Sequence, residues 1–337
     1  MATGTSIEIL DLRHFAAPTL RSVLDAEGEL WKQRLHWDYR ASAKLLMQYL
    51  DSHSLPGYVA LDGDQPVGYV FSVYEETKAV IGEVFAIPPA GESDLAAGGP
   101  FGCASPAHAV EEMLLKHLLE LLLNSPQVDR IESQLLLHPS ESHSALFRNA
   151  GFEIFRRLFM VQSLRGRWTA PHIEVPQGLE LRAWSEEDLT PAARLICESY
   201  TGHPDSTIND QYRTVHGSAR FLNNIVRYSG CGAFSAAVSH VVVDRARREP
   251  IALVLGSRVS PQSGHITQLC VHPSYRRNGL ARMLLSVAAF CFVRQGAEEI
   301  SLTVTEANDS AIRLYRNEGY ACRHIFDAAV WRRARRV

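Results

Sequence analysis

Alternating apolar and polar residues divide the chain into two halves that carry the same series of elements. In the second half, period-two patterns predict strands near 179–183, 232–243, 250–259, 264–271, 299–304, 320–326 and 328–334. Apolar residues at helical spacing predict helices near 186–199, 210–228, 280–295 and 308–318. The first half shows a strand, one or two helices, a three-strand meander, a helix, a strand, a helix and closing strands. This order predicts an α/β (α+β) fold in each half.

Matching sequence segments indicate that the two halves arose by duplication. Leu146–Phe152 reads LFRNAGF and Leu314–Tyr320 reads LYRNEGY, an offset of 314 − 146 = 168 residues. Three further pairs follow in order: Ile7–Leu10 with Leu179–Arg182, Pro66–Val70 with Pro250–Val254, and Ala86–Pro88 with Val271–Pro273. A stretch with three Pro or Gly residues and no periodicity separates the halves. The expected domains are therefore 1–168 and 179–337, with a linker at 169–178.

Composition narrows the class of protein. With 337 residues, 46% hydrophobic content and a net charge of −3, the chain fits a globular protein of two domains that does not bind nucleic acid. The longest apolar run, 283–293, is too short for a membrane span. Six cysteines without a C-x-x-C pair favour a cytoplasmic location, and His138 and His143 show no metal-ligand spacing, so no metal is expected.

The most informative segment connects the strand at 264–271 to the helix at 280–295. It contains Arg276, Gly279 and Ala281 in the pattern Arg-x-x-Gly-x-Ala. The first backbone N–H groups of a helix have no intrahelical partner, and the helix dipole adds positive potential there. The small side chains of Gly279 and Ala281 would let an anion approach these groups. The segment therefore predicts a phosphate-binding turn.

This motif, in its strand–turn–helix context, resembles the pyrophosphate loop of the GCN5-related N-acetyltransferases (GNAT). The resemblance covers essentially the whole chain and is specific in the second half. It implies two tandem acyl-CoA N-acyltransferase domains, each a mixed, mostly antiparallel sheet flanked by helices, with acetyl-CoA as cosubstrate. The residues that it implies for cofactor binding are Leu269, Cys270, Val271, Arg276, Arg277, Asn278, Gly279, Leu280, Ala281, Arg282, Asn308, Ala311 and Tyr315. It also implies a bulge that separates the strand at 264–271 from the one at 299–304.

Two residues are candidates for catalysis by direct transfer through a tetrahedral intermediate. Tyr315 shares a helix face with Asn308 and Ala311, and the resemblance implies that its phenol protonates the leaving thiolate. The alternative is a tyrosine that only packs. The resemblance implies that His265 stands where some relatives place a histidine as general base, and its ordinary pKa suits that role. A surface histidine at a hairpin is an equal alternative, and a third is that water accepts the proton. Cys270 has no assignable basic partner, so covalent catalysis is not expected.

The first half departs from the motif where the chemistry would lie. Its equivalent segment, 89–107, is longer and lacks the Arg-x-x-Gly pattern, and Phe147 replaces Tyr315. We therefore expect a degenerate first domain that supports the second or forms an interface. In the second half, Tyr200, His203 and Asp205 belong to a segment that either packs or forms a wall of the acceptor site.

These features predict an acyltransferase that moves an acetyl group from acetyl-CoA to a primary amine of a small molecule or a peptide N-terminus. The chain would act as a monomer or homodimer. Two alternatives stay open from the sequence. One is a non-catalytic acyl-CoA sensor, because the strand before the loop has no carboxylate. The other is an enzyme that uses a longer acyl donor.

Overall fold

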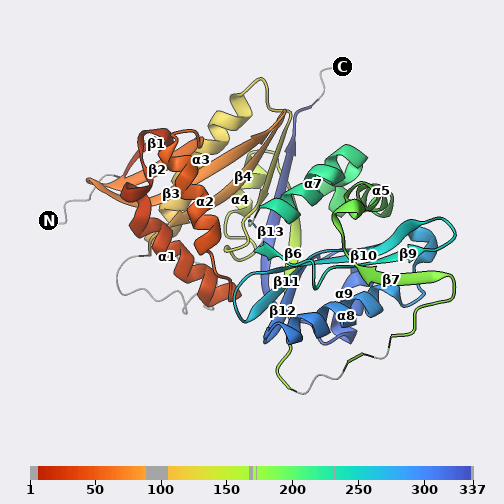
Figure 1. The fold of residues 1–337 in the computed structure, drawn as a ribbon. Coiled ribbons are helices and arrows are strands. Elements are labelled where there is room, and N and C mark those ends of the chain that lie inside the picture. Colours follow the sequence, from red (N-terminus) through yellow and green to blue (C-terminus); the bar gives the residue numbers. More distant parts are fainter. Residues whose placement is uncertain are drawn as a thin grey trace. The chain divides into compact units, whose positions relative to one another are not determined.

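The computed structural model describes residues 7–88, 105–166, 170–171, 173–228, 230 and 232–334 (Figure 1). It divides the chain into two compact units. The first contains Met1–Leu35, Ser42–Phe155 and Phe326–Val337, and the second contains His36–Ala41 and Arg156–Ile325. Residues 89–104 of the segment expected to replace the loop lie outside the described residues. Its last residues, Ser105 to Ala107, form the cap and first turn of a helix.

The first unit is a mixed sheet with helices packed on it. Its strands are β1 (Ile7–Asp11), β2 (Gly57–Asp62), β3 (Gln65–Glu75), β4 (Lys78–Ala86) and β5 (Arg130–Gln134), and its helices are α1 (Ala17–Leu35), α2 (Arg40–Asp51), α3 (Pro106–Asn124) and α4 (Ser144–Asn149). Neighbouring strands from β1 to β4 are antiparallel, and β4 and β5 are parallel. The helix faces that pack on the sheet carry regularly spaced leucines, such as Leu114 and Leu118 of α3, which are fully buried.

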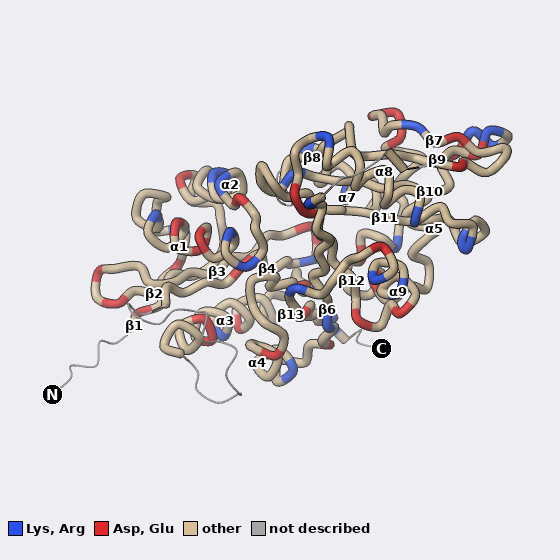
Figure 2. Tube along the Cα trace, turned by 90° about the horizontal axis from the view of Figure 1, so that it is seen from below, with Lys and Arg blue, Asp and Glu red and all other residues tan. Residues whose placement is uncertain are grey.

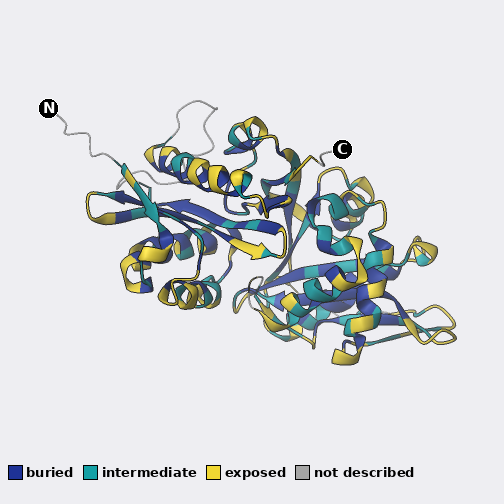
Figure 3. Ribbon diagram, turned by 90° about the horizontal axis from the view of Figure 1, so that it is seen from above, coloured by how far each residue is buried: buried dark blue, intermediate teal, exposed yellow. Residues whose placement is uncertain are grey.

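The second unit repeats this architecture. Its strands are β7 (Leu179–Ala183), β8 (Ala233–Phe234), β9 (His240–Asp244), β10 (Glu249–Arg258), β11 (Ser263–Val271) and β12 (Glu299–Thr305). Its helices are α5 (Leu189–Ser199), α6 (Asp205–Ile208), α7 (Val215–Arg227), α8 (Leu280–Arg294) and α9 (Asp309–Asn317). The order β7-β9-β10-β11-β12 is antiparallel except for the parallel pair β11 and β12. Buried residues follow the strands and the helix faces in contact with them (Figure 3).

Each unit takes its last strand from the other half of the sequence. Strand β6 (Glu153–Ser163) follows the first half, but its residues 157–163 pair with β12. Strand β13 (Ala321–Arg332) ends the second half, but Ala328–Arg332 pair with β5. The sequence patterns did not predict this exchange of terminal strands.

The exchange explains one error in the expected elements. Two closing strands were expected at 320–326 and 328–334, whereas β13 is continuous from Ala321 to Arg332. Asp327, near the point where β13 enters the first unit, accepts hydrogen bonds from Ser140 Oγ (2.6 Å), Glu141 N (2.7 Å) and Ser144 Oγ. Because the carboxylate of Asp327 has hydrogen-bond partners at this position, the strand can continue through it without a turn.

The strand expected at 232–243 is also wrong, because a turn divides it into β8 and β9. Ser235 N donates to Gly256 O at 2.9 Å and Val238 N donates to Ser235 O at 3.2 Å, which closes the turn between the two short strands.

Helix α8 lies close to the strands because two glycines leave room for one aromatic ring. A Cβ at Gly264 would lie 2.5 Å from Phe292, and one at Gly256 would lie 2.8 Å from Val238 and 2.9 Å from Phe292. Phe292 is fully buried. This contact fixes the helix whose N-terminus opens beside the end of β11.

Charges are mixed along the chain. Lys and Arg are interspersed with Asp and Glu in both units (Figure 2). None of the described helices combines the length and the apolar character that a membrane span requires.

Candidate active site

Strands β11 and β12 separate partway along their length and open a slot. Their parallel pairing ends at Ile266 and Leu302, although β11 continues to Val271. Against β10, Leu255 pairs with Gln268 and Gly256 pairs with Ile266, so Thr267 is an extra residue in β11. The expected bulge is therefore present, and it lies where the strands part.

The slot leads into a cavity of about 430 Å³. Its walls come from β11, the turn before α8, the start of α8, α9, β12 and the segment 199–212. The residues expected for cofactor binding that line it are Leu269, Cys270, Val271, Arg276, Arg277, Gly279, Leu280, Ala281, Arg282, Asn308, Ala311 and Tyr315. Asn278 belongs to the same turn but is not among the lining residues.

The open edge of β11 offers backbone N–H groups to the cavity. His272 N donates to Ile251 O of β10 at 2.8 Å. Because successive N–H groups of a strand point to opposite sides, those of Leu269 and Val271 point away from β10. They face the side from which β12 has separated. This edge can donate to a carbonyl oxygen or a developing oxyanion.

The turn before α8 has the geometry of an anion site. Gly279 is the N-cap residue with φ of 75°, and a Cβ there would meet no atom within 4 Å. Arg277 also has a positive φ, 69°. The first bond of the helix runs from Met283 N to Gly279 O at 3.0 Å, so the N–H groups of residues 280–282 have no intrahelical acceptor.

Two of the three arginines at the turn are engaged by the protein. Arg276 donates from Nη2 to Ser199 O at 2.7 Å and from Nε to Val271 O at 3.2 Å, which ties the turn to α5 and to the end of β11. Arg282 Nε lies 2.8 Å from Glu318 Oε1. Arg277 has no ion-pair partner among the described residues. It is therefore the arginine best placed to pair with a phosphate.

Tyr315 is held in the cavity wall by α9. Asn308 caps this helix by accepting a hydrogen bond from Ala311 N at 3.2 Å, and both residues line the same cavity. Tyr315 is 9% exposed. Burial and the nearby negative charge of Asp205 raise its pKa, so the phenol stays protonated at neutral pH and can donate a proton.

An acidic residue reaches the cavity from a different element than the strand. Asp205, at the start of α6, is the one carboxylate among the described lining residues. Its Oδ1 accepts a hydrogen bond from Thr305 Oγ1. His203 lies beside it: Nδ1 accepts from Asp205 N at 3.1 Å, and Nε2 is 3.2 Å from Asn308 Nδ2. The sequence singled out this segment only as a wall of the site.

Cys270 is unsuited to nucleophilic catalysis. Burial raises the pKa of its thiol to about 12, so the thiolate is scarce at neutral pH. This agrees with the expectation of direct transfer.

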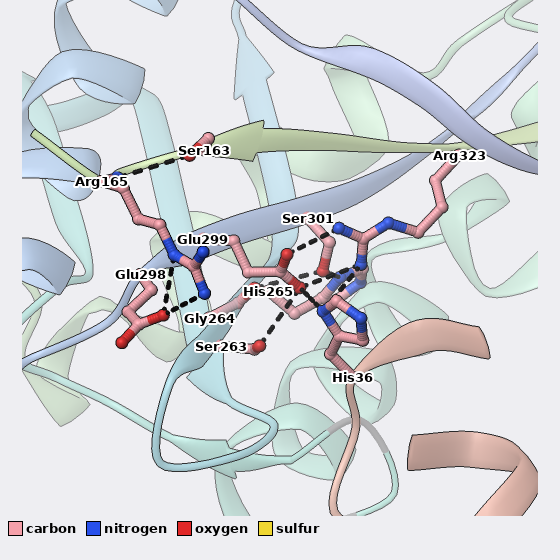
Figure 4. A network of polar contacts seen from close by, with 10 residues as sticks. All are labelled: His36, Ser163, Arg165, Ser263, Gly264, His265, Glu298, Glu299, Ser301 and Arg323. Carbon is pink, nitrogen blue, oxygen red and sulfur yellow. Dashed lines mark hydrogen bonds and ion pairs between the residues drawn. The ribbon is translucent and has the colours of Figure 1, made fainter. Parts of the chain in front are cut away.

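The structure does not place His265 at the cavity. Its side chain lies in the polar network of Figure 4, where Nδ1 is 2.9 Å from Ser301 Oγ, and its ring packs against Trp37 at 4.9 Å. It is 5% exposed, and burial together with the charge of Arg157 lowers its pKa to about 3. A base needs contact with the acceptor, and His265 is not among the residues that line the cavity, because it precedes the point where the strands part. Its role as a base stays a prediction.

Nearby in Figure 4, Glu299 accepts hydrogen bonds from Arg323 Nη2 (2.6 Å) and Ser263 Oγ (3.2 Å). Arg165 pairs with Glu298 at 2.7 Å. These contacts stabilise the ends of β11 and β12 that remain paired.

Arg157 is a lining residue that the sequence did not identify. It comes from β6, and its Nη2 donates to Thr303 Oγ1 of β12 at 3.4 Å. No pattern near Arg157 marks it as part of a site, because it reaches the cavity only through the exchanged strand.

Known proteins resemble this chain in two ways: part of its sequence matches a family model, and its fold is similar to solved structures. Residues 207–320 match the model of the acetyltransferase (GNAT) family. The fold resembles a GCN5-related N-acetyltransferase from Sphaerobacter thermophilus, with a TM-score of 0.61, 16% identity, and coverage of 97% of this chain and 95% of that one. It also resembles a tandem GNAT protein from the clavulanic acid biosynthesis pathway, with a TM-score of 0.59, 13% identity, and coverage of 98% and 100%.

A third similar structure is a glucosamine N-acetyltransferase region of a fungal multi-domain β-N-acetylglucosaminidase. Its TM-score is 0.60 at 13% identity, with coverage of 98% of this chain and 38% of that chain. At these identities the solved structures establish a shared fold and leave the substrate open. The match to the GNAT family model lies in the second half, and the solved structures extend the GNAT fold, including its tandem form, over nearly the whole chain.

Proposed function

We propose that the second unit transfers an acetyl group from acetyl-CoA to a primary amine of a small molecule or a peptide N-terminus. The observation that carries this proposal is a single cavity that brings together the anion-binding turn, the open edge of β11 and the protonated phenol of Tyr315. Acetyl-CoA supplies an activated thioester.

The residues fit a pyrophosphate and a thioester at opposite ends of the slot. The N–H groups of residues 280–282 and the guanidinium of Arg277 would hold the phosphates. The open N–H groups of Leu269 and Val271 would hold the pantetheine arm and the carbonyl oxygen. A Cβ placed on Gly279 would have no atom within 4 Å, so the space beside this residue is open and a phosphate could reach the turn.

In the proposed reaction the amine nitrogen forms a bond to the acyl carbon and the carbon–sulfur bond breaks. Tyr315 gives its proton to the leaving sulfur. Asp205, directly or through His203 or water, takes the proton that the amine loses. The proposed base is therefore Asp205 of α6 and not His265. The sensor alternative rested on the absence of a carboxylate from β11, and Asp205 supplies a carboxylate from another element.

The cavity wall favours a compact acceptor. Tyr200 and Tyr212 both line it and stack at 4.4 Å between ring centroids, beside His203. Aromatic rings next to one carboxylate suit a small cationic amine that must be desolvated before it attacks.

Thiol release from acetyl-CoA, measured with a panel of small amines and short peptides, tests the proposal. We expect amine-dependent release and an acetylated product by mass spectrometry. CoA binding at micromolar concentration without turnover on any amine would instead support a sensor. Parallel reactions with longer acyl-CoA donors establish whether acetyl is the preferred group.

A further inference from the structure

The first unit contains the same slot as the second, but its own side chains fill it. The parallel pairing of β4 and β5 ends at Ile81, and Gly82 is the extra residue between the pairs Phe71–Glu83 and Ser72–Ile81. Ile87 N donates to Val67 O of β3 at 2.8 Å, so the N–H groups of Val84 and Ala86 point to the open side.

These open-side groups are already bonded. Val84 N donates to Glu83 Oε1 at 3.0 Å, and Ala86 N donates to Glu111 Oε1 at 3.3 Å. The carbonyl oxygen of Val84 lies 2.8 Å from His138 Nε2. The equivalent positions of β11 face the open cavity, so the first slot has been converted from a ligand groove into a packed polar site.

Three histidines surround the carboxylate of Glu111 in this site, and we call His108, Glu111, His138 and His143 the histidine cluster. The distances to Glu111 Oε2 are 3.3 Å from His143 Nε2, 3.7 Å from His138 Nδ1 and 3.9 Å from His108 Nδ1. His108, Glu111 and His143 each offer a ligand atom, and these atoms lie within 4.8 Å of one another. His138 and His143 are 8% and 5% exposed.

His143 is the member of the histidine cluster whose ring nitrogens make no hydrogen bond within the described part of the chain. Both of its ring nitrogens are buried and neither has a hydrogen-bond partner among the described residues. Its contact with Glu111 is short but lacks hydrogen-bond geometry. A buried imidazole whose nitrogens make no hydrogen bond is costly unless something else coordinates it.

The other members are oriented as metal ligands are. His108 and Glu111 lie three positions apart in the first two turns of α3, which Ser105 caps, so both side chains project from one face. His138 Nε2 lies 2.8 Å from Val84 O, which leaves Nδ1 as the nitrogen on the side of Glu111, 3.7 Å from its Oε2. Ligand bonds of about 2.0–2.2 Å to zinc place tetrahedral ligand atoms about 3.4 Å apart, and the imidazole nitrogens lie 3.3–3.9 Å from Glu111 Oε2.

We propose that His108, Glu111 and His143 bind one divalent transition metal ion, with His138 as the fourth ligand, and that zinc is the ion of best fit. The donor set of imidazole nitrogens and one carboxylate suits zinc rather than magnesium or calcium. With its ligands all from the protein, the site would be structural. It would join β4, α3 and the segment before α4 where a cofactor slot once opened.

This proposal departs from the sequence expectation of no metal. His138 and His143 showed no ligand spacing because their partners, His108 and Glu111, lie on α3, before β5 in the chain. Only the fold brings the two pairs together.

The test uses the full chain after treatment with a chelator, titrated with zinc by calorimetry and with cobalt by visible absorption. We expect one zinc per chain and the intense absorption of tetrahedral cobalt. His108→Ala should weaken zinc binding at least about tenfold, the scale of effect seen when the surroundings of a metal ligand are altered. Because His108 is partly exposed, this variant should fold.

The matched control is His117→Ala, a change of an exposed histidine on the same helix whose Nδ1 contacts Met113 O. It should bind zinc as the wild type does. Glu111→Gln, checked by circular dichroism, provides a second loss-of-ligand variant. Equal zinc affinity in the wild type and in His108→Ala, or no stoichiometric binding by the wild type, would overturn the proposal and leave the cluster as an ion-pair network. Neither readout depends on acetyl transfer.

Discussion

Arg157 donates a hydrogen bond from Nη2 to Thr303 Oγ1 at 3.4 Å, although 146 positions separate the two residues in the chain. The bond connects β6, which follows the first half, to β12 of the second. It places a cation in the wall of the cavity that contains Tyr315 and Asp205. The proposed active site is therefore built from both halves of the sequence.

Arg157→Gln should lower kcat/KM for acetyl transfer by about tenfold or more, because a hydrogen bond from a charged group contributes about 1.5–3 kcal/mol. The control is Arg156→Gln at the preceding position, which removes an exposed ion pair with Glu306 and should leave the rate unchanged. Steady-state kinetics give kcat/KM for both variants and for the wild type. Equal rates in the two variants would show that Arg157 only packs.

Tyr315→Phe should lower kcat by about a hundredfold or more, the usual scale for loss of a general acid, while CoA affinity changes little. Tyr320→Phe serves as control, because Tyr320 is a buried tyrosine whose ring centre lies 5.8 Å from that of Tyr315 but which is not among the lining residues. The experiment combines steady-state rates with calorimetric CoA binding. A wild-type kcat in Tyr315→Phe would remove the acid assignment.

Two substitutions at Gly279 separate backbone strain from loss of the anion site. Both place a side chain at φ of 75°, which costs about 1–3 kcal/mol of stability. Gly279→Glu also adds a negative charge beside the phosphates and should weaken CoA binding by at least about a hundredfold. Gly279→Ala, which adds no charge, should lose much less CoA affinity. If both variants bound CoA equally well by calorimetry, the turn would have no role in phosphate binding.

His265 should make stability, rather than catalysis, depend on pH. Its folded pKa of about 3 lies below the unfolded value of about 6.5, so in this interval the unfolded chain holds a proton that the folded chain does not. Its contribution to the free energy of unfolding should therefore fall by up to about 1.4 kcal/mol for each pH unit below 6.5, and stay constant above it.

Denaturant unfolding of His265→Gln between about pH 4.5 and 6.5 measures this contribution, which the variant should lack. His216→Gln, a change of an exposed histidine, should retain the wild-type slope. The pH profile of kcat should be the same in His265→Gln and in the wild type. A lost alkaline or acid limb in that profile would restore His265 as a base.

The sequence predicted the duplicated series of elements, the order of most of them and the turn before α8, because each leaves a local signal. Gly279 and the residues of α8 and α9 lie within one short stretch whose spacing reflects helix geometry. Arg157 and the exchanged strands could not be found in this way. A strand carries its own apolar pattern but no record of which of two similar sheets it joins.

His265 and Asp205 show the same limit within the site. Counting back along β11 placed His265 near the reaction, but the point at which β11 and β12 separate depends on pairing between distant segments. Asp205 reaches the cavity because α6 folds back toward Thr305, one hundred positions later in the chain. Long-range contacts of this kind decide which polar residue lies at the cavity.

The strand exchange also predicts where the chain can be cut. A protein that begins at residue 150 keeps β6 and should bind CoA, whereas one that begins at residue 179 leaves the edge of β12 unpaired and should aggregate or lose binding. Size-exclusion chromatography and calorimetry distinguish the two fragments. Equal behaviour would mean that β6 contributes nothing to the second unit.

A duplicated copy that has lost its activity is normally free to decay or to be deleted. Here each copy supplies a strand that pairs with the sheet of the other, so neither copy can lose that strand without leaving a partner strand unpaired. Selection on the proposed active site would therefore extend to β6, and a mutation in β6 would act as a defect of a site that is encoded mostly elsewhere in the chain.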